Sequence, residues 1–74
     1  MTPADLAEAE RIKNRLRGAP DAAALALIRG EERDAFEKLG QRPGCEVLAI
    51  QIKNLVNHML RVEYPYQAAN KPPP

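Results

Sequence analysis

The chain carries one cysteine and one histidine, Cys45 and His58, and these residue types can ligate zinc or form a nucleophile and base pair. Both fall in the stretch that we expect to form the last helix. Because 13 residues of helix separate them, they lie about 20 Å apart, too far for shared coordination. We therefore expect Cys45 to be a small buried residue at the start of that helix. His58 is expected to be a polar residue on its flank.

A cluster of acidic residues is the second candidate for chemistry, since paired carboxylates can act as acid and base. Its members are Glu31, Glu32, Asp34 and Glu37. However, Arg33 with Glu37 and Asp34 with Lys38 have the i,i+4 spacing of ordinary surface ion pairs. Phosphate-binding loops, CxxC pairs, HExxH and nucleophile elbows are absent from the sequence. We therefore predict no catalytic residue, no metal ligand and no cofactor, and do not expect an enzyme.

Five basic residues are candidates for binding nucleic acid: Arg11, Lys13, Arg15, Arg17 and Arg42. On a helical wheel Arg11 and Arg15 lie nearly opposite Lys13 and Arg17. Glu8 and Glu10 also precede Arg11 and Lys13 by three residues, a spacing that favours ion pairs. The 11 Lys and Arg residues nearly balance the 10 Asp and Glu residues, so the net charge of +1 points to neither nucleic acid nor membrane. A small DNA-binding regulator with a helix-turn-helix-like arrangement is kept as the alternative function.

The elements that must position these residues are helices. Thr2 followed by Pro3 has the pattern of an N-cap and a first helical residue, and Gly18 with Pro20 closes the segment. This pattern predicts a helix over residues 3–17.

The second segment begins after Asp21, a good N-cap, and covers residues 22–39, with Gly40 as a left-handed stop. In one straight helix Glu32 would lie within the apolar stripe, an expensive place for a carboxylate. A break at Gly30 would instead place Glu32 in a first turn, where the helix dipole favours acids. One helix and two helices remain open alternatives here.

The last helix is predicted over roughly residues 44–63, starting near Pro43 and ending before Pro65, whose ring disfavours helix at Tyr64. Its apolar arc spans about 160°, wider than the roughly 100° that one packed face requires. Residues 65–74 contain four prolines and are predicted to be extended, with polyproline II at the end.

The predicted fold is all-α: a bundle of three helices, or four if Gly30 breaks the second, over residues 1–64, followed by a Pro-rich tail over 65–74. The predicted core consists of Leu25, Ile28, Phe36, Leu39, Leu48, Ile52, Leu55 and Met59. The surplus apolar and aromatic residues predicted to mediate association are Leu27, Val56, Leu60, Tyr64 and Tyr66.

The stretch from Leu25 to Leu60, with Pro43-Gly44-Cys45-Glu46-Val47-Leu48 opening a long amphipathic helix, resembles short bacteriophage-encoded proteins of uncharacterised function. The resemblance covers about half the chain, and Cys45 stands where a bulky aromatic is more typical. It implies an accessory, anti-defence or virion role and assigns no site residues.

The sequence as a whole predicts a non-enzymatic interaction protein that works by helix packing. It would act as a homo-oligomer or as an adaptor or inhibitor on a larger protein. A single cysteine and the lack of an apolar stretch near Met1 predict a cytoplasmic location, which is the host cytoplasm if the protein is viral. No stretch approaches the roughly 18 apolar residues that a membrane span needs, so no membrane partner is expected.

Overall fold

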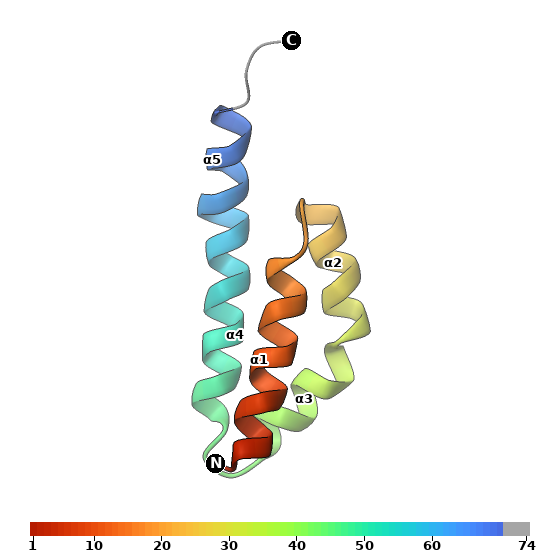
Figure 1. The fold of residues 1–74 in the computed structure, drawn as a ribbon, viewed down its shortest axis with the longest axis vertical. Helices are drawn as coiled ribbons and strands as arrows, with labels where there is room; N and C mark the ends of the chain where they lie inside the picture. Colours follow the sequence, from red (N-terminus) through yellow and green to blue (C-terminus); the bar gives the residue numbers. More distant parts are fainter. Residues whose placement is uncertain (71–74) are drawn as a thin grey trace.

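The computed structural model describes residues 1–70, and this part of the chain is helical without a strand (Figure 1). Its elements are α1 (Pro3–Arg17), α2 (Ala22–Glu31), α3 (Arg33–Gln41), α4 (Glu46–His58), the π-helical turn η1 (Met59–Glu63) and α5 (Tyr64–Ala69). The predicted all-α class is confirmed. The count of helices differs from the simple three-helix bundle, because α2 and α3 are separate helices. None of the described helices is long and apolar enough to cross a membrane.

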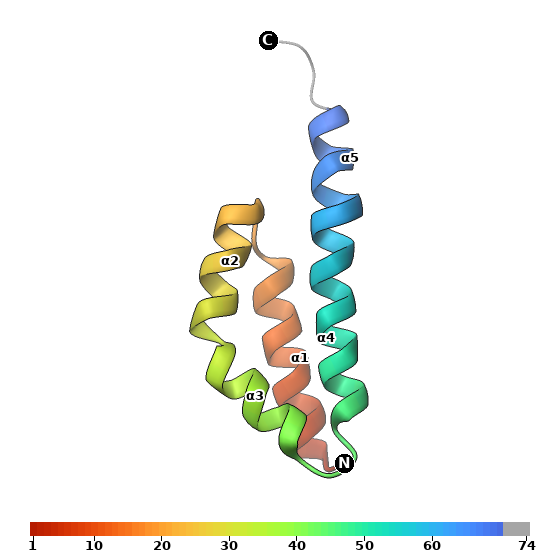
Figure 2. The same ribbon diagram turned by 180° about the vertical axis from the view of Figure 1, so that it is seen from behind.

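Helix α1 is the centre of the bundle and packs against α2, α3 and α4 (Figures 1 and 2). The chain runs up through α1, returns through α2 and α3, and runs up again through α4, η1 and α5. These last three elements form one continuous rod, which extends beyond the loop between α1 and α2. The buried apolar residues are Ala9, Ile12, Leu16, Ala19, Leu25, Leu39, Cys45, Leu48, Ile52, Val56 and Met59.

Helix α1 begins as the sequence predicts. The Thr2 hydroxyl accepts a hydrogen bond from the Asp5 N–H at 3.2 Å, and the Asp5 carboxylate accepts one from the Thr2 N–H at 3.1 Å. This reciprocal capping box satisfies two backbone donors at the helix start. The Asp5 carboxylate also accepts a hydrogen bond from the Arg42 guanidinium. The helix start is thereby tied to the segment that precedes α4.

The break between α2 and α3 falls at Glu32 and not at Gly30, which lies inside α2. The Glu32 backbone is non-helical, with φ −92° and ψ 2°. Its carboxylate is therefore not in a first turn that follows a break at Gly30, one of the two alternatives left open by the sequence. It stays on the apolar side of the segment, where the residue is only 8% exposed. Two arginines of α1 stabilise the buried charge, as described below.

The left-handed stop expected at Gly40 is also wrong. Gly40 lies within α3, beside α4: a Cβ built on it would be in ordinary van der Waals contact with the Cβ of Ala49, at 3.6 Å. The positive φ occurs instead at Gly44, with φ 78°, in the loop before α4. An L side chain rarely adopts this conformation, and Gly44 therefore allows the turn. Because the turn uses this residue, α4 begins at Glu46 rather than near Pro43.

The last helix does not end before Pro65 but continues to Ala69. In an uninterrupted α-helix the Pro65 ring would clash with the carbonyl of Arg61. In the structure the Tyr64 N–H donates to the Met59 carbonyl, five residues earlier, so that one wide π-helical turn precedes the proline. Pro65 then stands in the first turn of α5, where its missing N–H is tolerated. The prediction of an extended tail is therefore wrong for residues 65–69.

The π-helical turn also rotates the following side chains, because it inserts one residue into the helix. Tyr64 takes the core side that Glu63 would otherwise occupy. Its ring packs against the core, and its hydroxyl donates a hydrogen bond to the Ala19 carbonyl at 3.0 Å. The polyproline II segment predicted at the end of the chain includes residues 71–74, which lie outside the described residues.

The expected core residues lie inside the bundle to different degrees. Those with little exposure are Leu25, Leu39, Leu48, Ile52 and Met59, and those half-buried against them are Ile28, Phe36 and Leu55. The expectation omitted α1, whose Ala9, Ile12 and Leu16 are each 1% exposed. These side chains repeat at three- and four-residue spacing, the pattern of a helix face that packs on its neighbours.

Candidate protein-binding groove

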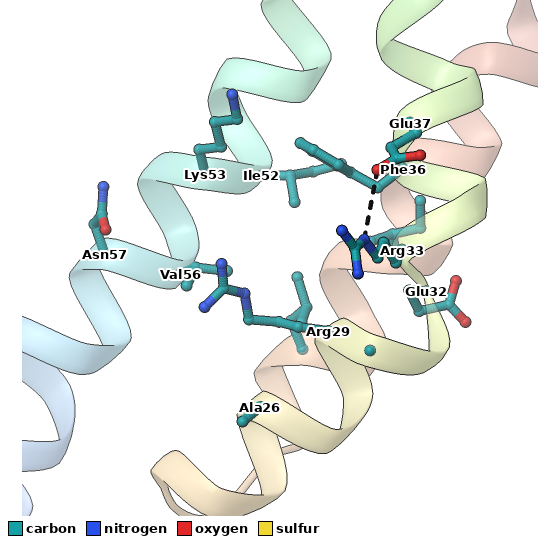
Figure 3. Close-up of a pocket in the computed structure, with 13 residues that line it drawn as sticks. Ala26, Arg29, Glu32, Arg33, Phe36, Glu37, Ile52, Lys53, Val56 and Asn57 are labelled. Atoms are coloured by element: carbon teal, nitrogen blue, oxygen red, sulfur yellow. Dashed lines mark ion pairs between the residues drawn. The ribbon is translucent and has the colours of Figure 1, made fainter.

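An open groove runs along α4, between this helix and the segment formed by α2 and α3. It consists of two neighbouring hollows. The upper hollow lies between α2 and α4 (Figure 3) and has a volume of about 670 Å³. The buried side chains of Ile12 and Leu16 of α1 also line it. The lower hollow lies between α3 and α4 and has a volume of about 340 Å³. Phe36, Glu37 and Lys53 line both hollows, which makes the two parts continuous.

The kink at Glu32 explains why the upper hollow is open. Below the kink α3 packs against α4, whereas above it α2 packs against α1 and α3. Arg11 and Arg15 of α1 hold the kink. The Arg11 Nη2 lies 2.6 Å from the Glu32 Oε2, and the Arg15 Nη1 lies 2.9 Å from the Glu32 Oε1. These contacts fix the end of α2 on α1 and leave a gap toward α4.

The same arginines set the ionisation of Glu32. Their guanidinium groups, Arg11 first, lower the pKa of Glu32 to about 2 against the opposing effect of burial. Arg15 also pairs with Glu31 at 2.9 Å, and Arg11 also pairs with Glu8. Glu32 is therefore a structural anion that is neutralised within the bundle, and Figure 3 shows it pointing away from the groove.

The walls of the groove carry small residues and cations. On α2 the small residues are Ala26 and Gly30, and a Cβ built on Gly30 would meet no atom within 4 Å. Arg29 reaches from α2 toward Val56 of α4 (Figure 3). Its aliphatic stem covers part of the apolar floor while the guanidinium stays at the surface. The upper hollow therefore combines an apolar base with a charged rim.

Lys53 and Phe36 form a bridge between the two hollows. The Lys53 ammonium lies 5.9 Å from the centroid of the Phe36 ring, within the range of a cation–π interaction. Arg33 stands beside this bridge and pairs with Glu37 at 3.5 Å, as its i,i+4 spacing predicts. Both partners are well exposed, and such a pair contributes only a few tenths of a kcal/mol, about 0.3–0.5. Arg33 can therefore exchange Glu37 for another acid at little cost.

The residues predicted to mediate association do not form one surface. Leu27 is 67% exposed on the side of α2 that faces away from α1, and Tyr66 is 69% exposed on α5. Val56 is not on the surface as expected but only 6% exposed, because the part of the apolar arc it occupies packs within the bundle and lines the base of the groove. Tyr64 packs on its own chain. Leu60 is 38% exposed and follows Val56 by one helical turn, which places it above the upper hollow.

The basic residues of the alternative function are mostly engaged by nearby acids. Arg11 and Arg15 bind Glu32, Lys13 pairs with Glu10 at 2.7 Å, and Arg42 pairs with Asp5. The Arg17 guanidinium donates to the Asn14 side chain at 3.0 Å. Four of the five basic side chains thus have a carboxylate partner, which reduces the positive potential that a nucleic-acid surface needs.

Cys45 and His58 flank α4 at its two ends. Cys45 is fully buried as the N-cap residue of α4, and burial together with the nearby Asp5 carboxylate raises the pKa of its thiol. His58 is largely exposed and lies 3.7 Å from Glu63. Within residues 1–70, the structure gathers no group of three His, Cys, Asp or Glu side chains that could hold a metal ion.

The sequence predicted only part of the groove: Val56 was expected to mediate association, and Phe36 and Ile52 were expected in the core. The groove residues Arg29, Gly30, Arg33 and Lys53 were not among the predicted site residues. Gly30 offered a signal, because a glycine inside a helix costs about 1 kcal/mol relative to alanine and needs a reason to be there. A comparison with protein-family models, curated proteins and solved structures finds no match to this chain. The function is therefore inferred from the groove itself.

Proposed function

We propose that this protein is a non-enzymatic interaction module that holds a helix of a larger protein in the groove, and so acts as an adaptor or inhibitor. The observation that carries the proposal is the continuity of the two hollows along α4. The groove-lining residues of α4 run from Glu46 to Asn57. At about 1.5 Å per residue they span about 17 Å, or three turns of a bound helix.

Gly30 is a second, independent observation that supports this proposal. It weakens α2, yet neither a close contact nor a positive φ within the chain requires a glycine at this position. A glycine in a groove wall lets the backbone of a ligand approach closely. Because Gly30 and Ala26 are both small, they leave space on the α2 side of the groove in which a partner helix could pack.

The resemblance to phage proteins, if it extends to function, would make the larger protein a component of the host or of the virion. The DNA-binding alternative gains no support from the paired arginines of α1. A module of this kind also fits the small size of the chain, because a partner helix would add apolar contacts to a core that supplies only about 3 to 5 kcal/mol alone.

The test is a selection for helices that bind the groove. A displayed library of amphipathic peptides of about 18 residues, with a fixed leucine stripe and randomised flanks, is panned on the full chain. Binders are then measured against Ala26→Trp, which fills the upper hollow from an exposed position, and against Ala7→Trp, an exposed alanine of α1 outside the groove. We expect Ala26→Trp alone to weaken binding at least tenfold. If no peptide shows this difference, the groove is not a helix-binding site and the proposal is wrong.

A further inference from the structure

We infer that the helix bound by the groove is acidic at one end, and that this end lies in the upper hollow between α2 and α4. This inference rests on the proposed function and names the chemistry of the partner. It depends on how charges are distributed between the two hollows. Each charged side chain that lines the groove is therefore considered in turn.

The upper hollow presents three cations, Arg29, Arg33 and Lys53. Two acids also line it, but neither offsets them fully. Glu32 is neutralised by two arginines of α1, and Glu37 is engaged by Arg33 alone. Neither Arg29 nor Lys53 has a carboxylate partner among residues 1–70. The upper hollow is therefore a positive rim around an apolar base.

The lower hollow has a different character. Its charged residues are Glu37, Glu46 and Lys53, so that acids outnumber bases there. Ile50, which is 55% exposed, and the small residues Gly40 and Ala49 supply apolar surface beside them. Apolar side chains of a partner fit this part better than carboxylates. The two hollows together select a helix that is acidic at one end and apolar or neutral at the other.

Helices α4 and α5 do not match this description, and the acids Glu8 and Glu10 of α1 are paired with Arg11 and Lys13 of the same helix. The exposed apolar residues of α4, Val47 and Ile50, are flanked by one acid and one base, Glu46 and Lys53. Helix α5 has no acidic residue and no basic residue. Charge complementarity therefore favours a foreign acidic helix over a second copy of this chain.

The experiment uses the peptides selected on the full chain. Their flanks are sequenced, and the affinity of the best binder is measured at low and at physiological ionic strength. The measurement is repeated with the double variant Arg29→Gln and Lys53→Gln and with the matched control Lys38→Gln, a surface lysine of α3 outside the groove. Each glutamine removes the positive charge and leaves a shorter, uncharged polar side chain, a change that the Lys38→Gln control shares. The molar mass of the unliganded protein is measured in parallel.

We expect Asp and Glu to be enriched at one end of the selected helices. We also expect the double variant to bind at least about fivefold more weakly at low salt, with little change for Lys38→Gln, because rim charges act through screened attraction. Groove binders with no acidic enrichment, or with equal affinity for the double variant, would overturn this inference and leave the proposed function standing. A dimer that Ala26→Trp dissociates would also overturn it, since a second copy would then occupy the groove.

Discussion

The α2–α3 segment lies along α4, and its two halves differ in how closely they approach that helix. In the lower half α3 packs against α4, with Gly40 beside Ala49. In the upper half α2 stands back, and the gap above Ile12 and Leu16 remains open. The kink at Glu32 separates the halves. One buried carboxylate and two arginines thus decide where this bundle closes and where it leaves a groove.

The difference shows how a small chain can keep a binding surface without losing its core. A straight α2–α3 helix would place Glu32 among apolar neighbours without a partner, which is destabilising. The kink turns Glu32 toward α1, where it gains charge-assisted hydrogen bonds from Arg11 and Arg15. The stability of the fold and the presence of the groove therefore depend on the same contact.

The largest effect is expected from removing that contact. Glu32→Ala should lower the free energy of unfolding by about 2 to 3 kcal/mol, because it deletes the charge-assisted hydrogen bonds that join α1 to the kink. Arg11 and Arg15 would keep only their pairs with Glu8 and Glu31. The matched control is Glu31→Ala, which removes a half-exposed acid that pairs with Arg15 alone and should cost at most about 0.5 kcal/mol. Urea unfolding of both variants measures the difference. Equal losses would show that Glu32 does not hold the kink.

A second prediction concerns acid. The pKa values of Asp5 and Glu32 are lowered to about 2, Asp5 chiefly by the hydrogen bond from the Thr2 backbone and Glu32 chiefly by Arg11. A group with a lowered pKa in the folded state contributes fully above its unfolded pKa and loses that contribution as pH falls toward the folded one. Stability should therefore be nearly constant from about pH 7 to 5 and then fall between about pH 4.5 and 2.

Chemical unfolding at a series of pH values checks this prediction. Glu32→Gln should flatten the lower part of the curve, since the variant has no proton to gain at that position. The Asp5→Asn variant should do the same with a smaller change, because the pKa of Asp5 is lowered less, from 3.8 to about 2, than that of Glu32, from 4.5 to about 2. A wild-type curve that stays flat to pH 2 would contradict both assignments.

Local features of the helices followed well from the sequence, while the position of the kink did not. Thr2, Pro3 and Asp21 marked helix starts because capping depends on residues close in sequence. The sequence also showed that Glu32 was costly inside the apolar stripe. It did not show that Arg11 and Arg15 would come within hydrogen-bond distance. That contact joins residues about 20 apart and depends on how α1 packs on α2.

The end of the last helix was missed for a related reason. The rule that a proline ends a helix considers only neighbouring residues, and it predicted that the helix would end before Pro65. The structure replaces the expected stop with a π-helical turn, and Tyr64 then reaches Ala19 from 45 residues away. The candidate site was the hardest part to predict, because a groove arises from the spacing between helices. In the sequence only Gly30 indicated it.

A third prediction concerns Gly30 in the wall of the upper hollow, where one substitution should raise stability and weaken binding. Gly30→Ala should raise the free energy of unfolding by about 0.5 to 1 kcal/mol, since alanine favours helix and the new methyl group meets empty space. It should weaken binding of a selected helix, because that methyl group stands in the groove wall. Asn54→Ala is the control: it lies in α4 outside the groove, and it should add about 0.5 kcal/mol without changing affinity. Gly30→Ala that binds as tightly as wild type would show that no ligand approaches α2 closely.

The smallest effect on stability is expected from Leu27→Glu and Leu60→Glu. Both leucines are exposed, so each charge should change the free energy of unfolding by less than about 0.5 kcal/mol and leave helicity intact. The two should differ in binding. Leu60 lies in η1, four residues after the groove-lining Val56, and a carboxylate there should repel the acidic end of a partner helix. Leu27 does not line the groove, so the Leu27→Glu variant should bind normally.

Molar mass in solution and peptide affinity, measured on the same two variants, decide between the surfaces. If Leu27→Glu lowers the molar mass, the outer side of α2 is a self-association face, as the sequence alone suggested. In that case the groove beside α4 would not be the principal surface for association. If Leu60→Glu weakens binding while Leu27→Glu leaves mass and affinity unchanged, the groove beside α4 carries the interaction. The reason is the geometry set by Glu32, which leaves one apolar edge of α4 facing an open space, whereas Leu27 is not among the residues that line the groove.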